Sequence, residues 1–490
     1  MVWEVVPLLV VLSLCLALRT IHLDALPVFD DEALYTRAAL LVTTLPHPAG
    51  WFISLNYGAP PLFVWLSAPL VRALGDPLLA ARLVSAVVGT AAVLPLWAVA
   101  RTLWGQATAL LAGLLYALCP FTLFYNRLAL LDGLVATCTA GALLFAIRLA
   151  RHARRRDALA LGLCLAAGLF TKIFAASALL LPVLAVAVAQ PPDRRAVFRL
   201  ACLSMVLAVV PLAVLLLLPQ SSDLVANVHV HAHHQGTPFS TLVDQIGTWG
   251  AALWLYLTPP VIVLAVAGLW TLRHERVARL LWPWALLGGL PPAIVPLTFL
   301  APRYFLYVAV PILLLAARGV VVLVVVACRR WPYRLPLQVA ALLGAGLLVT
   351  PAVAADTTII ATPARTPLLP FDRWQYVTGW PSGYALMRVV AYLRDQATER
   401  QLALIVSQYD TPRDALFVLL AHDPHIIVGT ANYSLLSGQP LRAIPGRRTF
   451  VLACHPYGQP LPRHAPYLHL VFHAATADGQ GSDDLYEITK

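Results

Sequence analysis

Charged residues are scarce in this sequence: 12% of its 490 residues are Asp, Glu, Lys or Arg, and 60% are hydrophobic. A soluble protein carries about a quarter charged residues, so this composition excludes an ordinary soluble chain and indicates lipid as the solvent. In a soluble protein, the formal net charge of +11 would point to nucleic acid. Here the arginines cluster in short loops between apolar runs, which membrane orientation explains better.

Cysteine is also sparse. The seven cysteines include no Cys-x-x-Cys pair, and most lie in or beside apolar runs, so neither a disulfide framework nor a thiolate metal site is indicated. A nucleotide-binding glycine motif and internal repeats are lacking as well. The first apolar run has no basic stretch before it and no small-residue cleavage site after it, so we interpret it as a retained helix and not as a signal peptide.

Long apolar runs recur from end to end and predict a polytopic α-helical membrane protein with about eleven spans, each close to the ~20 residues that cross a bilayer. The fifth and sixth are the weakest, because they are short and only residues 171–173 separate them. The predicted spans are Val5–Ile21, Leu83–Leu103, Ala107–Tyr125, Leu128–Leu149, Ala158–Phe170, Phe174–Ala189, Leu200–Pro219, Ala251–Leu272, Leu281–Phe299, Tyr304–Ala327 and Leu337–Ala355.

Arginines fall in alternate connections between these spans, and the positive-inside rule makes those connections cytoplasmic. The alternation is unbroken. The sequence therefore predicts a plasma or inner membrane protein with a cytoplasmic N-terminus and an extracytoplasmic C-terminus. The arginines concerned are Arg101; Arg151, Arg154, Arg155 and Arg156; Arg194, Arg195 and Arg199; Arg273, Arg276 and Arg279; and Arg329, Arg330 and Arg334.

Two predicted outer segments, 22–82 and 220–250, are too long to be simple links. Within the first, Glu32–Leu45 and Pro60–Leu74 have apolar residues at helical spacing with a few polar ones between them. That pattern is typical of helices lying in the membrane interface.

Residues 356–370 are rich in Thr and Pro and are interpreted as a linker between a transmembrane domain at 1–355 and a small extracytoplasmic α/β domain at 371–490. The predicted elements of the second domain are helices Gly383–Arg400 and Ala415–Leu420 and strands Leu402–Val406, Ile426–Val428, Thr449–Ala453, Leu468–His473 and Leu485–Ile488.

Three acidic residues, Asp30, Asp31 and Glu32, follow the first apolar run. Charge close to lipid is costly to hold unless function needs it. Adjacent carboxylates repel, so we expect at least one to bind its proton more tightly or to be held by a cation, and either state suits a general base or a metal ligand. The alternative is that the acids only cap a helix beginning at Ala33, where the helix dipole favours them.

Few charged residues lie near the predicted outer ends of the later spans. Arg127 and Asp132 either pair as a clamp at the membrane edge, or Asp132 lies beside the acidic cluster and Arg127 faces an anionic substrate. Lys172 is the only lysine before Lys490, and Arg303 lies at another outward helix end. One such cation usually extends toward water, whereas two that converge on one cavity suit a phosphate.

A run of histidines in the second outer segment has a spacing that suits metal binding if it is extended, because alternate residues of a strand share a side. The alternative is a polar loop near the interface. No cofactor is required by the sequence, and a divalent metal is kept as an alternative with His231, His233 and His234 as its candidate ligands.

In this order, the motifs resemble those of the GT-C membrane glycosyltransferases, in particular the bacterial protein O-mannosyltransferase and aminoarabinose-transferase-like family. The resemblance covers residues 1–350, and 376–384 is similar to a segment that follows the helices in some relatives. The matching segments are Asp31–Tyr35 with Ala38 (the family's Asp-Glu-x-x-Tyr), Ala59–Leu66 (its Lys-Pro-Pro-Leu), Ala81–Leu83, Asn126–Arg127 with Leu131–Asp132, Gly168–Lys172 and Pro302–Tyr304.

That family transfers a sugar from a polyprenyl-phosphate carrier to an acceptor on the outer side of the membrane. The resemblance implies that Asp31 is the catalytic carboxylate, which activates or orients the acceptor hydroxyl, with Glu32 and Asp132 in support. It implies Lys172 and Arg303 at the donor phosphate, where charge develops on the leaving group. The further substrate-binding candidates are Asp30, Tyr35, Arg127 and Tyr304.

One departure from the family concerns metal binding. Several relatives have an acidic residue and a lysine before the proline pair, where this chain has Gly58 and Ala59. In those relatives the acid can help to bind a divalent metal. The departure argues against a metal here, unless the histidine run or Asp30 compensates.

Two other functions compete with glycosyl transfer. A transporter or flippase of a lipid-linked substrate should have broken helices, charges near the membrane midplane and often two related halves, whereas we find no half-to-half repeat. A non-catalytic scaffold leaves the acidic cluster and Lys172 without a purpose. The expected partners are a polyprenyl-phosphate-linked sugar, a lipid, glycan or protein acceptor, and membrane lipids, but no nucleic acid.

Overall fold

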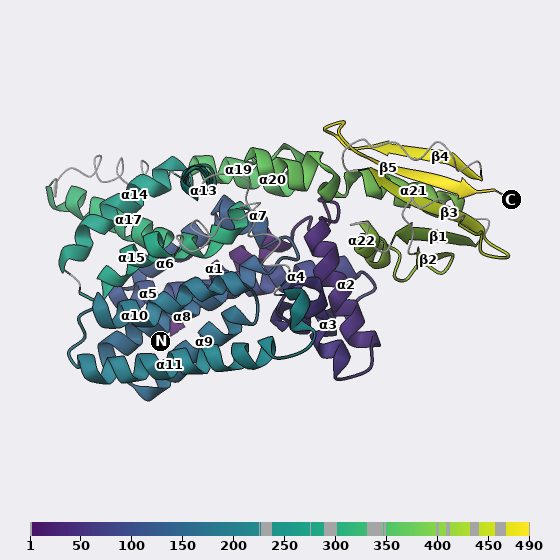
Figure 1. Ribbon diagram of the computed structural model, residues 1–490. Coiled ribbons are helices and arrows are strands. Elements are labelled where there is room, and N and C mark those ends of the chain that lie inside the picture. The colour runs from purple at the N-terminus through teal and green to yellow at the C-terminus, as the bar shows by residue number, and fades with distance from the viewer. Residues whose placement is uncertain are drawn as a thin grey trace. The chain divides into compact units, whose positions relative to one another are not determined.

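A computed structural model of the chain is mostly helical and ends in a small β-sheet (Figure 1). Its residues form two compact units. The helical unit comprises 1–23, 47–65 and 82–367, and the sheet unit comprises 24–46, 66–81 and 368–490. The structure describes residues 2–224, 226, 238–274, 276–288, 301–330, 346, 349–397, 401–407, 412–431, 441–455 and 467–489.

The helices among the described residues follow the apolar runs of the sequence. In the helical unit, α9 packs against both α8 and α11, as Figure 1 shows. The helices are α1 (Val2–Thr20), α2 (Asp30–Thr44), α3 (Leu62–Ala73), α4 (Pro77–Ala91), α5 (Val93–Trp104), α6 (Gln106–Ala117), α7 (Pro120–Tyr125), α8 (Asp132–His152), α9 (Arg155–Leu169), α10 (Leu180–Ala187), α11 (Arg194–Leu216), α13 (Pro238–Leu257), α14 (Pro259–Leu269), α15 (Leu281–Leu287), α17 (Ala309–Arg330), α19 (Thr350–Ala361), α20 (Pro370–Arg373), α21 (Tyr384–Gln396) and α22 (Pro412–Leu419).

By length and composition, four stretches of the described chain could each cross a membrane, or five if a bent pair counts as one span. Shorter apolar helices add to these, and the number of spans stays a prediction. The four stretches are Pro77–Trp104, Asp132–His152, Arg194–Leu216 and Pro302–Val326.

Prolines explain why some predicted spans are not single helices. The predicted span Ala251–Leu272 bends by 100° at Thr258, which precedes two prolines and has a left-handed φ of 68°. The predicted span Ala107–Tyr125 divides into α6 and α7 just before Pro120. Proline disfavours helical geometry at the residue before it, so an apolar run can be long enough to cross a membrane and still be broken.

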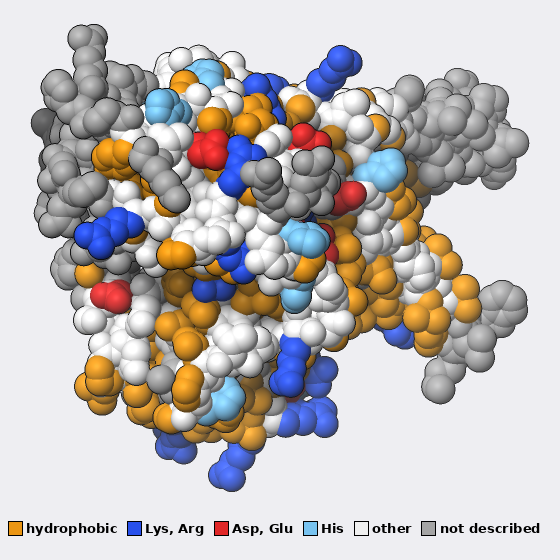
Figure 2. Space-filling model, turned by 90° about the vertical axis from the view of Figure 1, so that its right-hand side faces the viewer, with side chains coloured by type: hydrophobic (Ala, Val, Ile, Leu, Met, Phe, Trp, Pro, Cys, Tyr) orange, Lys and Arg blue, Asp and Glu red, His pale blue; other side chains and the backbone are white. Residues whose placement is uncertain are grey.

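Hydrophobic side chains lie open on the surface, as lipid contact requires (Figure 2). The clearest case is α11, where only 22% of the apolar window is buried and Val206, Val210 and Val214 are exposed. Their spacing of four residues places these valines on one face of the helix. In water this face would be an exposed apolar patch, whereas in a bilayer it is solvated by acyl chains.

Two glycines let α14 and α17 approach each other at backbone distance. A Cβ on Gly268 would meet the carbonyl oxygen of Leu315, and a Cβ on Gly319 would meet that of Leu264. Small residues allow this kind of close crossing between apolar helices.

We expect Gly319→Leu to destabilise the helical unit by about 1–3 kcal/mol, because the new side chain meets backbone that cannot rotate away. Thermal unfolding of the purified protein measures the effect. Gly250→Leu in α13 is the control, because the space around Gly250 is open to 4 Å. Equal melting temperatures for Gly319→Leu and Gly250→Leu would contradict the close crossing.

The described residues of the sheet unit form a sheet of five strands in the order β2-β1-β3-β5-β4. The central strand β1 pairs in parallel with β2 and β3, whereas β5 is antiparallel to β3 and β4. These strands and the two helices α21 and α22 match the elements predicted from sequence. The strands are β1 (Leu402–Ser407), β2 (Ile426–Ala431), β3 (Arg448–His455), β4 (Leu468–Ala475) and β5 (Ser482–Ile488).

The core of the sheet unit includes part of the first predicted outer segment. Val28 and Ala33 are buried with Val389 of α21 and with Leu404 and Leu452 of the sheet. The sequence-based division assigned 24–46 to the transmembrane domain, whereas contacts group it with 368–490. The acidic stretch thus begins a helix whose apolar face packs in the same core as the C-terminal sheet.

Candidate active site

The acidic stretch lies in the first turn of α2, which begins at Asp30 and not at Ala33. Phe29 is the N-cap residue, and its amide donates to the Glu32 carboxylate at 3.1 Å. Glu32 is fully buried, so this bond satisfies an amide that would otherwise be unpaired at the helix start. The capping interpretation therefore accounts for Glu32.

Asp30 and Asp31 occupy the same turn but are not fully buried. Burial raises the pKa of Asp30 well above its usual value of 3.8, and the negative charges of Asp31 and Asp414 raise it further. The pKa of one carboxyl of the pair is thus raised, as expected for adjacent acids. Tyr35 lies one helical turn after Asp31, on the same face.

The raised pKa of Asp30 makes stability depend on pH. The folded state binds this proton more tightly than the unfolded chain, so the stabilisation is present below pH 3.8 and is lost as pH rises through the folded pKa. Asp30→Asn should therefore raise the melting temperature of the sheet unit at pH 8 but not below about pH 4. Asp24→Asn, at an exposed position of the same unit, is the control. An equal rise in the melting temperature of Asp30→Asn at both pH values would contradict the raised pKa of Asp30.

A second group of charged residues comes together in the helical unit. Asp132, at the start of α8, pairs with Lys172 Nζ at 2.7 Å and with Arg303 Nε at 3.7 Å. Lys172 Nζ lies 4.1 Å from the centroid of the Tyr304 ring, and Phe174 stacks on the same ring with the centroids 5.0 Å apart. We call Asp132, Lys172, Arg303 and Tyr304 the Asp132 cluster.

The Asp132 cluster carries one more positive than negative charge in a buried place. The side chains of Asp132, Lys172 and Arg303 are 5%, 15% and 4% exposed. Buried cations need anionic or hydrogen-bonding partners. An anion that binds beside Lys172 and Arg303 would pair with both and accept their hydrogen bonds.

Arg127 is engaged at the end of α1. Its Nη1 donates to the carbonyls of Leu18 and Ile21 at 2.9 and 2.7 Å, and its Nη2 donates to that of His22 at 2.8 Å. Carbonyls at a helix C-terminus lack partners within the helix, and a guanidinium satisfies several at once. These contacts are structural, and a role of Arg127 toward an anionic substrate stays a prediction.

The candidate metal ligands His231, His233 and His234 lie outside the described residues. Within the described ranges, no group of three or more His, Cys, Asp or Glu side chains could hold a metal ion. Gly58, which stands where relatives have an acid, ends a short 3₁₀ helix at Ala49–Tyr57 with a φ of 71°. That left-handed conformation favours glycine over an acidic residue.

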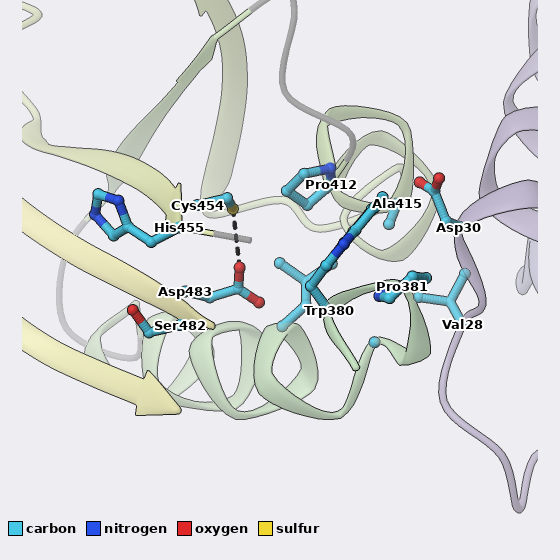
Figure 3. A pocket seen from close by; sticks show the side chains of 12 residues that line it. Val28, Asp30, Trp380, Pro381, Pro412, Ala415, Cys454, His455, Ser482 and Asp483 are labelled. Carbon is cyan, nitrogen blue, oxygen red and sulfur yellow. Dashed lines mark hydrogen bonds between the residues drawn. The ribbon is translucent and has the colours of Figure 1, made fainter. Parts of the chain in front are cut away.

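Sequence reasoning missed a pocket in the sheet unit that Asp30 lines together with Trp380, Cys454 and Asp483 (Figure 3). Cys454 Sγ donates to Asp483 at 2.9 Å. Trp380 belongs to the segment 376–384, whose similarity to relatives was the available signal. The pairing of β3 with β5, which brings Cys454 opposite Asp483, had no signal in the sequence.

Comparisons with known proteins give a family match over part of the chain and a fold. A sequence model of the family described as dolichyl-phosphate-mannose-protein mannosyltransferase matches residues 58–219. The comparison with curated proteins gives no match.

Two crystal structures of ArnT from Cupriavidus metallidurans resemble nearly the whole chain. The apo structure is 16% identical, with 99% of this chain and 97% of that chain covered and a TM-score of 0.62. The structure bound to undecaprenyl phosphate is 15% identical, with 99% and 98% covered and a TM-score of 0.58.

The archaeal oligosaccharyltransferase AglB from Archaeoglobus fulgidus is 14% identical, with a TM-score of 0.51. The match covers 87% of this chain but only 64% of AglB, so the chain spans less than two thirds of that protein. At these low sequence identities, the similarity to solved structures shows that the chain shares their fold. The predicted resemblance to the GT-C membrane glycosyltransferases is thus confirmed: the chain has the fold of ArnT, and residues 58–219 match the dolichyl-phosphate-mannose-protein mannosyltransferase family.

Proposed function

We propose that this chain is an integral membrane glycosyltransferase that moves a sugar from a polyprenyl-phosphate carrier to a hydroxyl of a lipid, glycan or protein on the extracytoplasmic side. The observation that carries the proposal is the Asp132 cluster, in which Lys172 and Arg303 share one carboxylate. Two cations that converge on one buried place suit a phosphate. The fold shared with an ArnT structure that holds undecaprenyl phosphate supports the same ligand class.

In this proposal, Lys172 and Arg303 bind the phosphate of the donor, and Asp132 orients the two cations. When the bond from the anomeric carbon to the phosphate oxygen breaks, negative charge grows on that oxygen. Fixed cations stabilise it without having to reorganise. Tyr304, whose ring lies next to Lys172, keeps the ammonium in place.

Asp31 is proposed as the general base. Its carboxylate takes the proton of the acceptor hydroxyl while the hydroxyl oxygen attacks the anomeric carbon. Asp31 lies in the first turn of α2 beside Asp30, whose pKa is raised by burial and by the nearby charges of Asp31 and Asp414. Glu32 positions the helix start through its bond to the Phe29 amide.

The orientation in the membrane is part of the proposal. The alternation of arginine-rich connections supports a cytoplasmic N-terminus and an extracytoplasmic C-terminus. A lipid-linked donor also explains why the charged groups belong to a chain with so much lipid-facing surface.

Product formation separates this function from transport. Purified protein is incubated with radiolabelled polyprenyl-phosphate sugars and membrane extract, and the label is followed into new glycosidic products. We expect label in such products. A transporter or flippase would instead move the label across sealed vesicles without forming a new bond.

Exhaustive chelation tests the metal alternative. If His231, His233 and His234 hold a required ion, chelation abolishes transfer and a divalent cation restores it. Transfer that survives chelation removes the histidine-run hypothesis.

A further inference from the structure

The pocket in the sheet unit is built from four separate parts of the chain (Figure 3). Asp30 comes from the start of α2, and Trp380 comes from the turn before α21. The third part is the start of α22, and the fourth is formed by the adjoining ends of β3 and β5. The pocket-lining residues from those two strands are Cys454, His455, Ser482 and Asp483.

A glycine before α21 allows the backbone there to approach the backbone just before α2. Gly383 has a φ of 73°, and a Cβ there would meet the carbonyl oxygen of Val28. Both residues line the pocket. A fixed backbone contact at this point makes the pocket a preformed feature of the sheet unit and not an accidental gap.

Polar groups around the pocket lack hydrogen bonds. Trp380 Nε1 is buried and has no hydrogen-bond partner among the described residues. His455 Nε2 has no hydrogen bond there either, but Asp484 Oδ2 lies 3.9 Å from it as an ion-pair partner. Within the same ranges we find no hydrogen bond or ion pair to the Asp30 carboxyl. Since more than about 90% of buried polar groups in folded proteins are hydrogen-bonded, the buried Trp380 N–H indicates a ligand that accepts from it. The half-buried Asp30 carboxyl, which lines the same pocket, is a second group that this ligand would contact.

The chemistry of the lining selects among ligand classes. The described lining includes two carboxyl groups, Asp30 and Asp483, and neither Lys nor Arg. A phosphate would find no Lys or Arg among these lining residues to pair with. An ammonium group only donates hydrogen bonds, so it would leave the Trp380 N–H without an acceptor. A hydroxyl both donates and accepts and can serve all of these groups, and the indole ring offers an apolar face beside them.

We propose that this pocket is the acceptor subsite of the enzyme and that it binds a neutral, hydroxyl-rich carbohydrate headgroup. Its role as an acceptor subsite rests on the glycosyl transfer proposed above. Two pKa directions agree with a neutral ligand. Burial, with the nearby charges of Asp31 and Asp414, raises the pKa of Asp30. Desolvation lowers that of His455, although Asp484 opposes the shift and His473 adds to it. Both groups therefore favour their uncharged forms.

The test measures binding to the purified full-length protein in detergent by saturation-transfer NMR. The probes are neutral tetrasaccharides of mannose, glucose, galactose and arabinose, with spermidine and inorganic phosphate as charged comparisons. We expect at least one tetrasaccharide to bind and Trp380→Phe to weaken it about tenfold, because the variant keeps the ring but removes one donor. Trp254→Phe, at an exposed position of α13, should leave the affinity unchanged.

The outcomes distinguish the pocket from the catalytic proposal. If no tetrasaccharide binds, or if wild type and Trp380→Phe bind it equally well, the proposal that this pocket binds carbohydrate is wrong. If spermidine or phosphate binds and its binding depends on Trp380, the proposal that the ligand is a neutral carbohydrate is wrong.

Transfer from a polyprenyl-phosphate sugar is measured on the same preparations. With transfer active, Trp380→Phe should raise the KM for the acceptor and leave binding of undecaprenyl phosphate unchanged. If carbohydrate binding depends on Trp380 but no transfer occurs, the carbohydrate site stands and the proposed reaction fails.

Discussion

Asp31→Asn should lower the rate of sugar transfer by about 10²–10⁴-fold, the range that a positioned general base contributes. The amide has nearly the shape of the carboxylate but cannot take the proton of the acceptor hydroxyl. Initial rates of transfer from a polyprenyl-phosphate sugar into membrane extract give the measurement.

Two comparisons make the Asp31→Asn result specific. Asp24→Asn removes an exposed carboxylate from the same unit and should transfer at the wild-type rate. Binding of undecaprenyl phosphate should be retained in both variants, because the proposed phosphate ligands belong to the helical unit. Equal transfer by wild type and Asp31→Asn would show that the catalytic role assigned to Asp31 is wrong.

The second large effect concerns stability. Asp132→Asn should destabilise the helical unit by about 3–5 kcal/mol, because it removes the carboxylate that pairs with the buried Lys172 and Arg303. Thermal unfolding of the purified protein in detergent measures the loss. Undecaprenyl phosphate should recover part of it, since the ligand brings the missing negative charge.

A matched ion pair in the same unit controls for the loss of a carboxylate. Asp157 accepts from Arg148 at 2.8 Å, but the Arg148 side chain is 36% exposed and stays hydrated when its partner is removed. Asp157→Asn should therefore cost only about 1 kcal/mol. A double variant Asp132→Asn with Lys172→Met should be more stable than Asp132→Asn alone, because it removes one of the stranded cations. If Asp132→Asn unfolds at the wild-type temperature, the cluster does not hold buried, mutually dependent charges.

Local sequence patterns predicted much of the fold. The apolar spacing that predicted helices at Glu32–Leu45 and Pro60–Leu74 corresponds to α2 and α3, each within two residues at its start and one at its end. The β-branched runs of the C-terminal region predicted all five strands of the sheet. Periodicity and composition act over a few residues, so elements formed by local preference can be read directly.

Long-range packing could not be predicted in this way. Asp132, Lys172 and Arg303 are up to 171 positions apart, and only the packing of α8 with the chain around positions 172 and 303 brings them together. The resemblance named all three residues, but the residues alone left Asp132 open between a clamp with Arg127 and a place beside the acids. The burial of Val28 and Ala33 in the core of the sheet unit was equally hidden, because apolar residues do not specify which core they join.

The composition of the sheet unit has a consequence for how this protein can be recombined. Because 24–46 and 66–81 group with 368–490, the proposed base and pocket belong to one discontinuous module. A chimaera that replaces only the C-terminal region with that of another protein would leave Val28 and Ala33 facing a foreign core. Exchanging all three segments together would keep this core and transfer the proposed acceptor specificity with it.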